Sequence, residues 1–141
     1  GEYKHTMDSK GRVVIPSKFR DELKQGCVIT KGQDNCLQIL TKGNWEEEAG
    51  KIAALPKTNK TSRQLMRSLF SGAIAATIDS SGKILIPENL RAYSQMNPGQ
   101  SITITGSGSL VEIWSTKHWK KVQLEADKAY ANINELTTGG S

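Results

Sequence analysis

The chain contains an internal repeat, which constrains the fold more than any other feature of the sequence. The stretch Asp8–Pro16, DSKGRVVIP, returns as Asp79–Pro87, DSSGKILIP, at an offset of 71 residues. Downstream the offset becomes 74, because the second copy has three extra residues around Asn97-Pro98-Gly99, where a loop insertion costs little. The sequence therefore predicts two tandem copies of one unit, residues 1–72 and residues 73–141.

Each copy has the pattern of a strand, a turn, a second strand, a short helix, a hairpin and a closing helix. The turn is Asp-x-x-Gly, in which Asp bonds back to the backbone and Gly accepts the exit geometry of a type I turn. Pro suits the first turn of the short helix that follows. In the first copy these rules predict strands at 3–7 and 12–15, a helix at 17–24 and a hairpin of 28–30 with 37–40.

Apolar residues at helical spacing predict further helices. The expected elements are a helix at 44–55, a helix capped by Thr61 or Ser62 that ends at Gly72, a second hairpin of 102–105 with 110–114 joined by 106–109, and a C-terminal helix from Trp119 to Leu136. A unit of about 70 residues buries little apolar area alone. We therefore expect the two copies to pair about a pseudo-two-fold axis as one α+β domain flanked by amphipathic helices.

The two cysteines flank the first hairpin. With residues 32–35 as its turn, Cys36 would face Lys31 and Cys27 would face Leu40, so the cysteines would not be cross-strand partners. In a reducing cell both are expected to be small apolar side chains without a disulfide.

No pattern typical of an enzyme or a metal site occurs. The cysteines, His5 and His118 lack zinc-ligand spacing. There is no Gly-x-Ser-x-Gly, phosphate-binding loop or dinucleotide fingerprint. The aspartates of the two turns are explained by the backbone bonds of those turns. We expect no catalysis, no metal, no cofactor and no small-molecule substrate.

The sequence also has no pattern of a membrane protein. No window approaches 18 consecutive apolar residues, and no apolar segment follows a basic start. We therefore expect a cytoplasmic protein without a membrane partner.

The formal net charge of +5 is unevenly distributed. Residues 1–72 contain 13 Lys and Arg against eight Asp and Glu, whereas residues 73–141 contain six of each. The excess clusters near the first turn, with Lys10 at the tip of an expected hairpin, Arg12 beyond it, and Lys18 and Arg20 on the next helix. A basic surplus is typical of proteins that bind polyanions.

This cluster fits DNA recognition. A two-stranded ribbon fits the major groove of B-DNA, where Arg binds guanine O6 and N7 with two hydrogen bonds. Lys and backbone N–H groups would meet phosphates. The alternative is a solvated turn with scattered charges.

The turns belong to a longer motif that is present twice. It is Asp8-Ser9-Lys10-Gly11-Arg12-x-x-Ile15-Pro16-x-x-Phe19-Arg20 in the first copy and Asp79-Ser80-Ser81-Gly82-Lys83-x-Leu85-Ile86-Pro87-x-x-Leu90-Arg91 in the second. This pair of motifs resembles the MraZ family of bacterial transcriptional regulators, and the resemblance covers nearly the whole chain.

The resemblance implies a fold, an assembly and a function. The fold would be two AbrB-like swapped-hairpin ββαββα units in one chain, assembled into a ring such as an octamer. The function would be sequence-specific binding of short G-rich direct repeats upstream of the operon for cell division and cell-wall synthesis, mostly as a nucleoid-associated repressor. The DNA-reading stretch would place Asp8 and Arg12 in the first copy and Asp79 and Lys83 in the second. Further expected DNA contacts are Ser9, Lys10, Lys18, Arg20, Ser81 and Arg91.

The second copy departs from the first at two positions of the turn. Lys83 stands where the first copy has Arg12, and Lys cannot form the planar fork of Arg. Ser81 stands where the first copy has Lys10. We therefore expect the first turn to dominate DNA affinity.

A second function class remains open. It is a protein-binding module of the antidote type in toxin–antitoxin pairs, which shares the hairpin fold. That function predicts a long disordered C-terminal arm, whereas the sequence here predicts an amphipathic helix.

Overall fold

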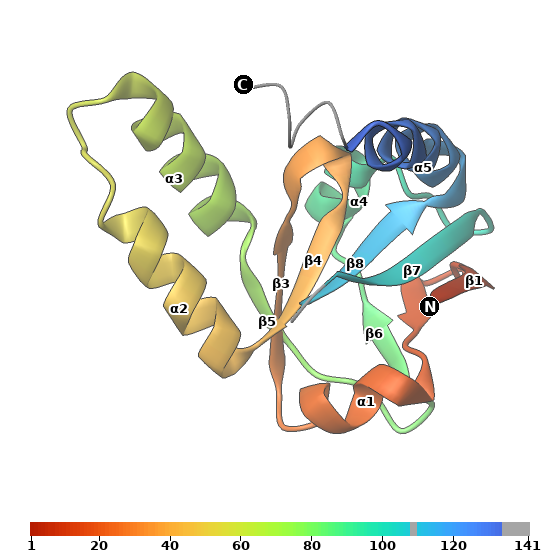
Figure 1. Cartoon of the computed structure of the whole chain (residues 1–141). Coiled ribbons are helices and arrows are strands. Elements are labelled where there is room, and N and C mark those ends of the chain that lie inside the picture. Colours follow the sequence, from red (N-terminus) through yellow and green to blue (C-terminus); the bar gives the residue numbers. More distant parts are fainter. Residues whose placement is uncertain (108–109, 134–141) are drawn as a thin grey trace.

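The computed structural model describes residues 1–107 and 110–133, which form a six-stranded antiparallel sheet, a two-stranded sheet and five α-helices (Figure 1). The strands are β1 (Glu2–Thr6), β2 (Arg12–Val14), β3 (Cys27–Lys31), β4 (Leu37–Thr41), β5 (Ile74–Ala76), β6 (Lys83–Leu85), β7 (Ser101–Ser107) and β8 (Leu110–Ser115). The helices are α1 (Ser17–Leu23), α2 (Lys42–Ala53), α3 (Lys60–Gly72), α4 (Glu88–Ser94) and α5 (Thr116–Ala131). The predicted α+β class is confirmed.

The large sheet is symmetric with respect to the two repeats, because each strand of the first repeat and its counterpart in the second lie at equal distances from opposite edges. The order is β1-β7-β8-β4-β3-β5. The hairpins β3–β4 and β7–β8 meet at β4 and β8, and the first strand of each repeat pairs with the hairpin of the other repeat. The two repeats therefore build one sheet jointly, and we call this arrangement interlaced.

The small sheet also joins the two repeats. β2 pairs with β6, with Arg12 opposite Leu85, Val13 opposite Ile84 and Val14 opposite Lys83. The prediction of a ribbon between residues 3–7 and 12–15 is therefore wrong. The hydrogen bonds of β1 are taken by β7 of the second repeat, and pairing β2 with β6 buries Val13 and Ile84 completely.

The core combines side chains of both sheets and both repeats. Its completely buried members include Met7, Val13, Ile15, Ile29, Ile84, Ile86, Leu90 and Ile104. Burial of a side chain of this size stabilises a fold by roughly 1.5–3 kcal/mol. Because the same cluster contains equivalent residues of both repeats, neither repeat has a complete core of its own.

The helices between the repeats differ in detail from the prediction. α2 and α3 extend to one side of the sheet (Figure 1). The side chain of Asn59 caps α3 by accepting a hydrogen bond from the N–H of Ser62 at 3.2 Å. The predicted caps Thr61 and Ser62 are wrong, because α3 begins at Lys60 and both residues lie inside its first turn.

The first hairpin is shifted by one residue from the predicted register. Lys31 faces Leu37, and Cys27 faces Thr41. The shift arises because the Gly32 N–H donates to the Cys36 carbonyl, which makes Cys36 part of the closing turn. Cys27 and Cys36 are buried, free and not cross-strand partners, as predicted.

Two of the predicted elements include residues that the structure does not describe. Gly108 and Ser109 in the second hairpin, and Leu136 at the end of the predicted C-terminal helix, lie outside the described residues. Within the described part of the chain, no helix combines the length and apolar character that a membrane span requires.

Candidate nucleic-acid interface

The first turn is held by its own aspartate. The Gly11 N–H donates to the Asp8 carbonyl at 3.1 Å, and the Asp8 N–H donates to the Arg12 carbonyl at 3.0 Å. Oδ1 of Asp8 accepts from the N–H groups of Lys10 at 2.9 Å and Arg12 at 2.8 Å. Gly11 has a φ of +82°, which an L side chain rarely adopts. The predicted Asp-x-x-Gly turn is present.

The second turn repeats this geometry. The Gly82 N–H donates to the Asp79 carbonyl at 2.9 Å, and φ of Gly82 is +77°. Oδ1 of Asp79 accepts from the N–H groups of Ser81 at 2.8 Å and Lys83 at 3.0 Å. The Asp79 N–H donates to the Lys83 carbonyl at 2.8 Å, so the same four-bond pattern closes both turns.

The hydrogen bonds to the two carboxylates lower their pKa. The Arg12 N–H contributes most to holding the pKa of Asp8 well below its usual range, followed by the Arg12 side chain and the Lys10 N–H. The Lys83 N–H contributes most to lowering the pKa of Asp79. Both turns therefore carry a fixed negative charge near neutral pH.

Pairing of β2 with β6 places the two turns beside each other. Nε of Arg12 donates to Oδ2 of Asp8 at 2.8 Å, and Nη1 of Arg12 lies 3.5 Å from Oδ2 of Asp79. Nζ of Lys83 lies 3.4 Å from Oδ2 of Asp8. The structure thus brings together four of the predicted site residues, Asp8, Arg12, Asp79 and Lys83, in one network across the repeats.

The geometry around Arg12 suits contact with an external acceptor. The side chains of Arg12 and Lys83 remain 32% and 28% exposed. Asp8 binds Arg12 through Nε at 2.8 Å, and the contact of Nη1 with Asp79 is longer, at 3.5 Å. A guanidinium binds guanine through two nitrogens at its edge. An arginine fixed in this way loses less side-chain entropy when it binds a partner.

The other predicted residues are not equally placed. Ser9, Lys10 and Ser81 are exposed at the turns. Lys18 is exposed on α1 and lines a hollow that contains no residue of either turn. Arg20 and Arg91 are partly buried, and each guanidinium lies against the glycine of the other repeat's turn.

The sequence did not predict two backbone hydrogen bonds that hold Met7, the residue before the first turn. The Gly99 N–H donates to the Met7 carbonyl at 2.8 Å, and the Met7 N–H donates to the Gln100 carbonyl at 3.0 Å. These bonds extend the pairing of β1 with β7 to the residue that precedes Asp8. The available signal was the three-residue insertion around Gly99, which is absent from the first copy.

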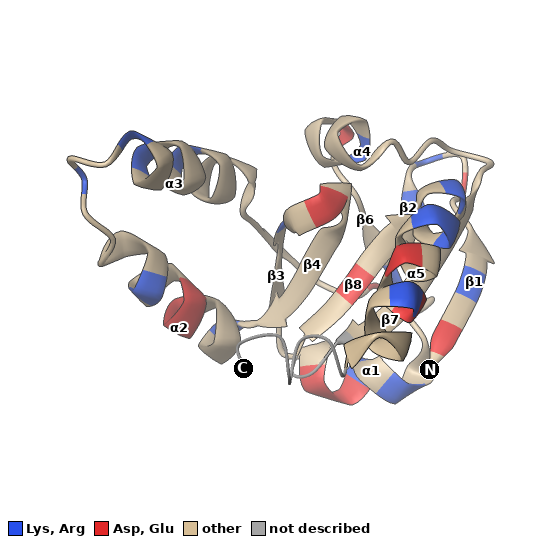
Figure 2. Cartoon of the chain, turned by 45° about the horizontal axis from the view of Figure 1, so that its top comes forward, with Lys and Arg blue, Asp and Glu red and all other residues tan. Residues whose placement is uncertain are grey.

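Charge is spread over the molecule. Figure 2 shows Lys and Arg on β1, α3 and α5, with Asp and Glu on α2 and β8 among them. The first turn carries Lys10 and Arg12 with one aspartate, and the second carries Lys83 with one aspartate. The local excess of positive charge at the two turns is therefore small.

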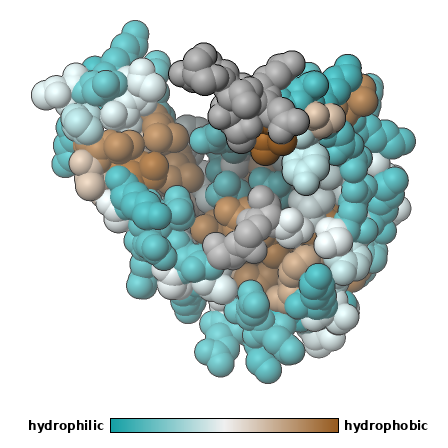
Figure 3. All heavy atoms as spheres, viewed as in Figure 1, coloured by the Kyte–Doolittle hydropathy of each residue, from teal (hydrophilic) through white to brown (hydrophobic). Residues whose placement is uncertain are grey.

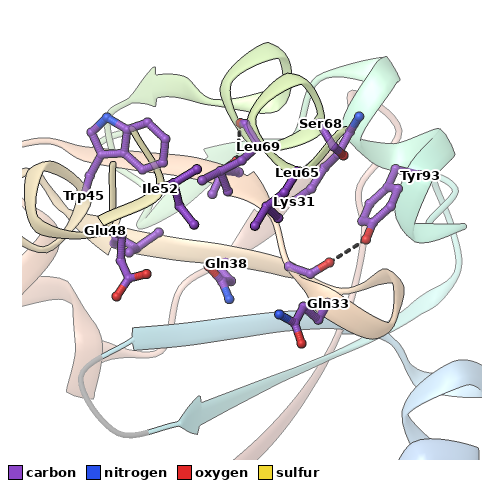
Figure 4. Close-up of a pocket in the computed structure, with 13 residues that line it drawn as sticks. Lys31, Gln33, Gln38, Trp45, Glu48, Ile52, Leu65, Ser68, Leu69 and Tyr93 are labelled. Carbon is purple, nitrogen blue, oxygen red and sulfur yellow. Dashed lines mark hydrogen bonds between the residues drawn. The ribbon is translucent and has the colours of Figure 1, made fainter. Parts of the chain in front are cut away.

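A hollow of about 220 Å³ lies elsewhere, between α2, α3 and the β3–β4 hairpin. Its lining includes Trp45 and Ile52 of α2 and Leu65 and Leu69 of α3, as Figure 4 shows. In Figure 3 the adjacent surface of α2 and α3 is apolar. The hollow contains no residue of either turn. Among the described residues, no group of three or more His, Cys, Asp and Glu could hold a metal ion.

Comparison with known proteins gives matches along nearly the whole chain. The family model described as "MraZ protein, putative antitoxin-like" matches twice, at residues 1–68 and 69–138. The transcriptional regulator MraZ of Roseiflexus castenholzii is 46% identical over 133 residues, which are 94% of this chain and 91% of the relative. The transcriptional regulator MraZ of Carboxydothermus hydrogenoformans is 42% identical over 135 residues, 96% of this chain and 93% of the relative.

Proposed function

The chain belongs to the MraZ family of transcriptional regulators, and we propose that it acts by sequence-specific binding of duplex DNA through its two turns. The observation that carries this proposal is the network across the turns, in which Asp8 fixes Arg12 beside Lys83 on one ribbon. Arg12 and Lys83 would contact base edges in the major groove. Lys10, Ser9 and Ser81, exposed at the turns, would contact phosphates and set the register.

The remaining parts of the proposal concern assembly and target. The repeats, residues 1–72 and 73–141, would be swapped-hairpin units of the AbrB type, and copies of the chain would form a ring. The ring would repress the promoter of the bacterial cell-division and cell-wall gene cluster by binding short direct repeats. Because one chain offers few cations at its turns, several linked copies would be needed for strong binding by avidity.

The test is a titration of the full chain onto its own upstream DNA and onto scrambled DNA across a salt series. A specific regulator keeps a preference for the upstream DNA at moderate salt, whereas binding through phosphates alone weakens equally on both DNAs. The variant Arg12→Ala/Lys83→Ala should lose the preference. The matched control is Lys60→Ala/Arg67→Ala, which removes the same charge from exposed positions of α3 and should keep it.

Two results would contradict the proposal. One is equal binding of the wild-type chain to both DNAs at every salt concentration. The other is an equal loss of preference in the control and the turn variant, because the net charge and not the turns would then be responsible.

A further inference from the structure

Arg20 and Arg91 occupy equivalent positions on α1 and α4, and each side chain crosses to the other repeat. A Cβ built on Gly82 would lie 2.5 Å from Cζ of Arg20. A Cβ built on Gly11 would lie 3.2 Å from Cζ and Nε of Arg91. The Arg20 guanidinium therefore packs against Cα of Gly82 in the second turn, and the Arg91 guanidinium packs against Cα of Gly11 in the first turn.

Backbone hydrogen bonds connect the same groups across the repeats. The Ile15 N–H donates to the Gly82 carbonyl at 2.9 Å, and Nε of Arg20 donates to the Ile15 carbonyl at 2.6 Å. Arg20 thus bonds to Ile15, the residue after β2, and Ile15 in turn bonds to Gly82, on which the Arg20 guanidinium packs.

The equivalent contacts of Arg91 are fewer. The Ile86 N–H donates to the Gly11 carbonyl at 3.0 Å, as its counterpart does. Nε of Arg91 is buried and has no hydrogen-bond partner within the described part of the chain. The Arg91 guanidinium therefore packs on Gly11 without a hydrogen bond like the one that Nε of Arg20 makes.

We propose that Arg20 and Arg91 are positioning residues, each of which holds the other repeat's turn in its DNA-binding geometry without touching DNA itself. This inference rests on the proposed function. Both side chains are partly buried against glycine, which is the residue with the greatest backbone freedom. A flat guanidinium over the Cα limits that freedom, whereas the ammonium of Lys has no plane to pack.

The crossed arrangement has an unexpected consequence. Arg91 belongs to the second repeat but holds Gly11 in the first turn, which carries Lys10 and Arg12. Loss of Arg91 should therefore weaken DNA discrimination more than loss of Arg20, which holds the turn with Ser81 and Lys83.

The DNA experiment compares Arg91→Ala, Arg20→Ala and the exposed control Arg67→Ala on upstream and scrambled DNA across a salt series. A positioning residue lowers the ratio of specific to scrambled affinity and leaves the salt slope unchanged. A phosphate contact weakens both DNAs equally and makes the slope shallower by about 0.9 per contact. We expect Arg91→Ala to lower the ratio about tenfold, Arg20→Ala to lower it less, and Arg67→Ala to leave it unchanged.

The second experiment measures deuterium uptake of the full chain without DNA. Each turn contains hydrogen-bonded amides that report its opening, such as those of Lys10, Gly11 and Arg12. Arg91→Ala should speed exchange in a peptide covering residues 8–12 and leave 79–83 unchanged, and Arg20→Ala should do the reverse. Unchanged uptake in peptides of β4 and β8 shows that the variants are folded. Arg91→Lys should behave as Arg91→Ala does.

The outcomes separate this inference from the proposed function. The inference is overturned if each substitution affects its own repeat's turn or neither turn, or if the salt slope falls while the ratio stays constant. A wild-type chain without preference for its upstream DNA would overturn the proposed function, but it would not change the exchange experiment, which is done without DNA. The exchange pattern alone would then decide whether the arginines hold the turns.

Discussion

The first and second turns share a backbone and differ in the side chains that they expose. In both, an aspartate accepts two backbone N–H bonds and a glycine with positive φ closes the turn. The two residues whose backbone N–H groups make these bonds are Lys10 and Arg12 in the first turn, but Ser81 and Lys83 in the second, so only their side chains differ. The residues that build the turn are thus the same in both copies, and the residues available for contact are different.

The comparison shows that the same turn backbone can present two different sets of side chains. Asp8 illustrates the inequality, because its Oδ2 faces both Arg12 at 2.8 Å and Lys83 at 3.4 Å. Asp79 has a longer contact, 3.5 Å, to Arg12. The first turn therefore organises the charges of both, and substitutions in the two turns should have unequal effects.

The largest difference is expected for DNA affinity. Arg12→Ala removes a guanidinium that can form two bonds to guanine and should weaken binding to upstream DNA roughly 10- to 100-fold. Lys83→Ala removes a single ammonium and should weaken it about threefold. Titrations of both variants at the same salt concentration measure the difference. Equal losses would show that the two turns contribute equally.

A structural difference follows from the glycines. Gly82→Ala should lower the free energy of unfolding by about 2 kcal/mol, because φ is +77° and the added Cβ meets Cζ of Arg20. Gly11→Ala should cost about 1 kcal/mol, since the contact with Arg91 is looser. Urea denaturation measures both.

Gly99→Ala is the control for these substitutions, because φ is +85° and nothing lies within 4 Å of the added Cβ. Its cost is that of the backbone conformation alone. If Gly82→Ala costs no more than Gly99→Ala, the packing of Arg20 on Gly82 is not restrictive.

The second turn should gain affinity when it is given the side chains of the first. Ser81→Lys/Lys83→Arg adds one cation and replaces the ammonium by a guanidinium, and an arginine at position 83 should still contact the Asp8 carboxylate that Lys83 contacts. We expect upstream DNA to bind about threefold more tightly. Unchanged affinity would indicate that the second turn does not meet a base edge, and the reverse change in the first turn, Lys10→Ser/Arg12→Lys, serves as the comparison.

The smallest expected difference concerns acid stability. The pKa of Asp8 and that of Asp79 are both lower in the folded chain than their ordinary value of 3.8. The unfolded chain therefore takes up protons first as the pH falls, so the stabilisation is complete above about pH 4 and is lost below it. Asp8→Asn should flatten the fall in urea midpoint below pH 4 more than Asp79→Asn. The opposite order would show that Asp79 is the more strongly bound carboxylate.

The sequence predicted the local structure well because the signals were local. The Asp-x-x-Gly turns depend on the residues within them, and each forms as expected. The partner of β2 was not predictable in this way. Residues 3–7 and 12–15 are close in the sequence, so a hairpin between them is the usual expectation. Nothing local shows that Val13 instead pairs with Ile84, 71 residues further along.

The site shows the same limit. Arg12 and Lys83 were predicted from their places in the motif, and the structure brings them together. Arg20 and Arg91 match each other in the repeat, and sequence alone assigned them to DNA contact. Their partly buried position over Gly82 and Gly11 depends on how the repeats cross, which a comparison of the copies cannot reveal.

The interlaced sheet also has a consequence for how such a chain can diverge. The segment that links the two repeats runs from α2 through α3 and contains no strand. All strand pairings between the repeats are therefore made by strands outside this link. The link places both turns in one chain, so the two turns can be substituted independently of each other. In an assembly of two identical chains, a substitution would alter both turns at once. In this chain a mutation changes one turn only, and Ser81 and Lys83 differ from Lys10 and Arg12 on an otherwise equivalent frame.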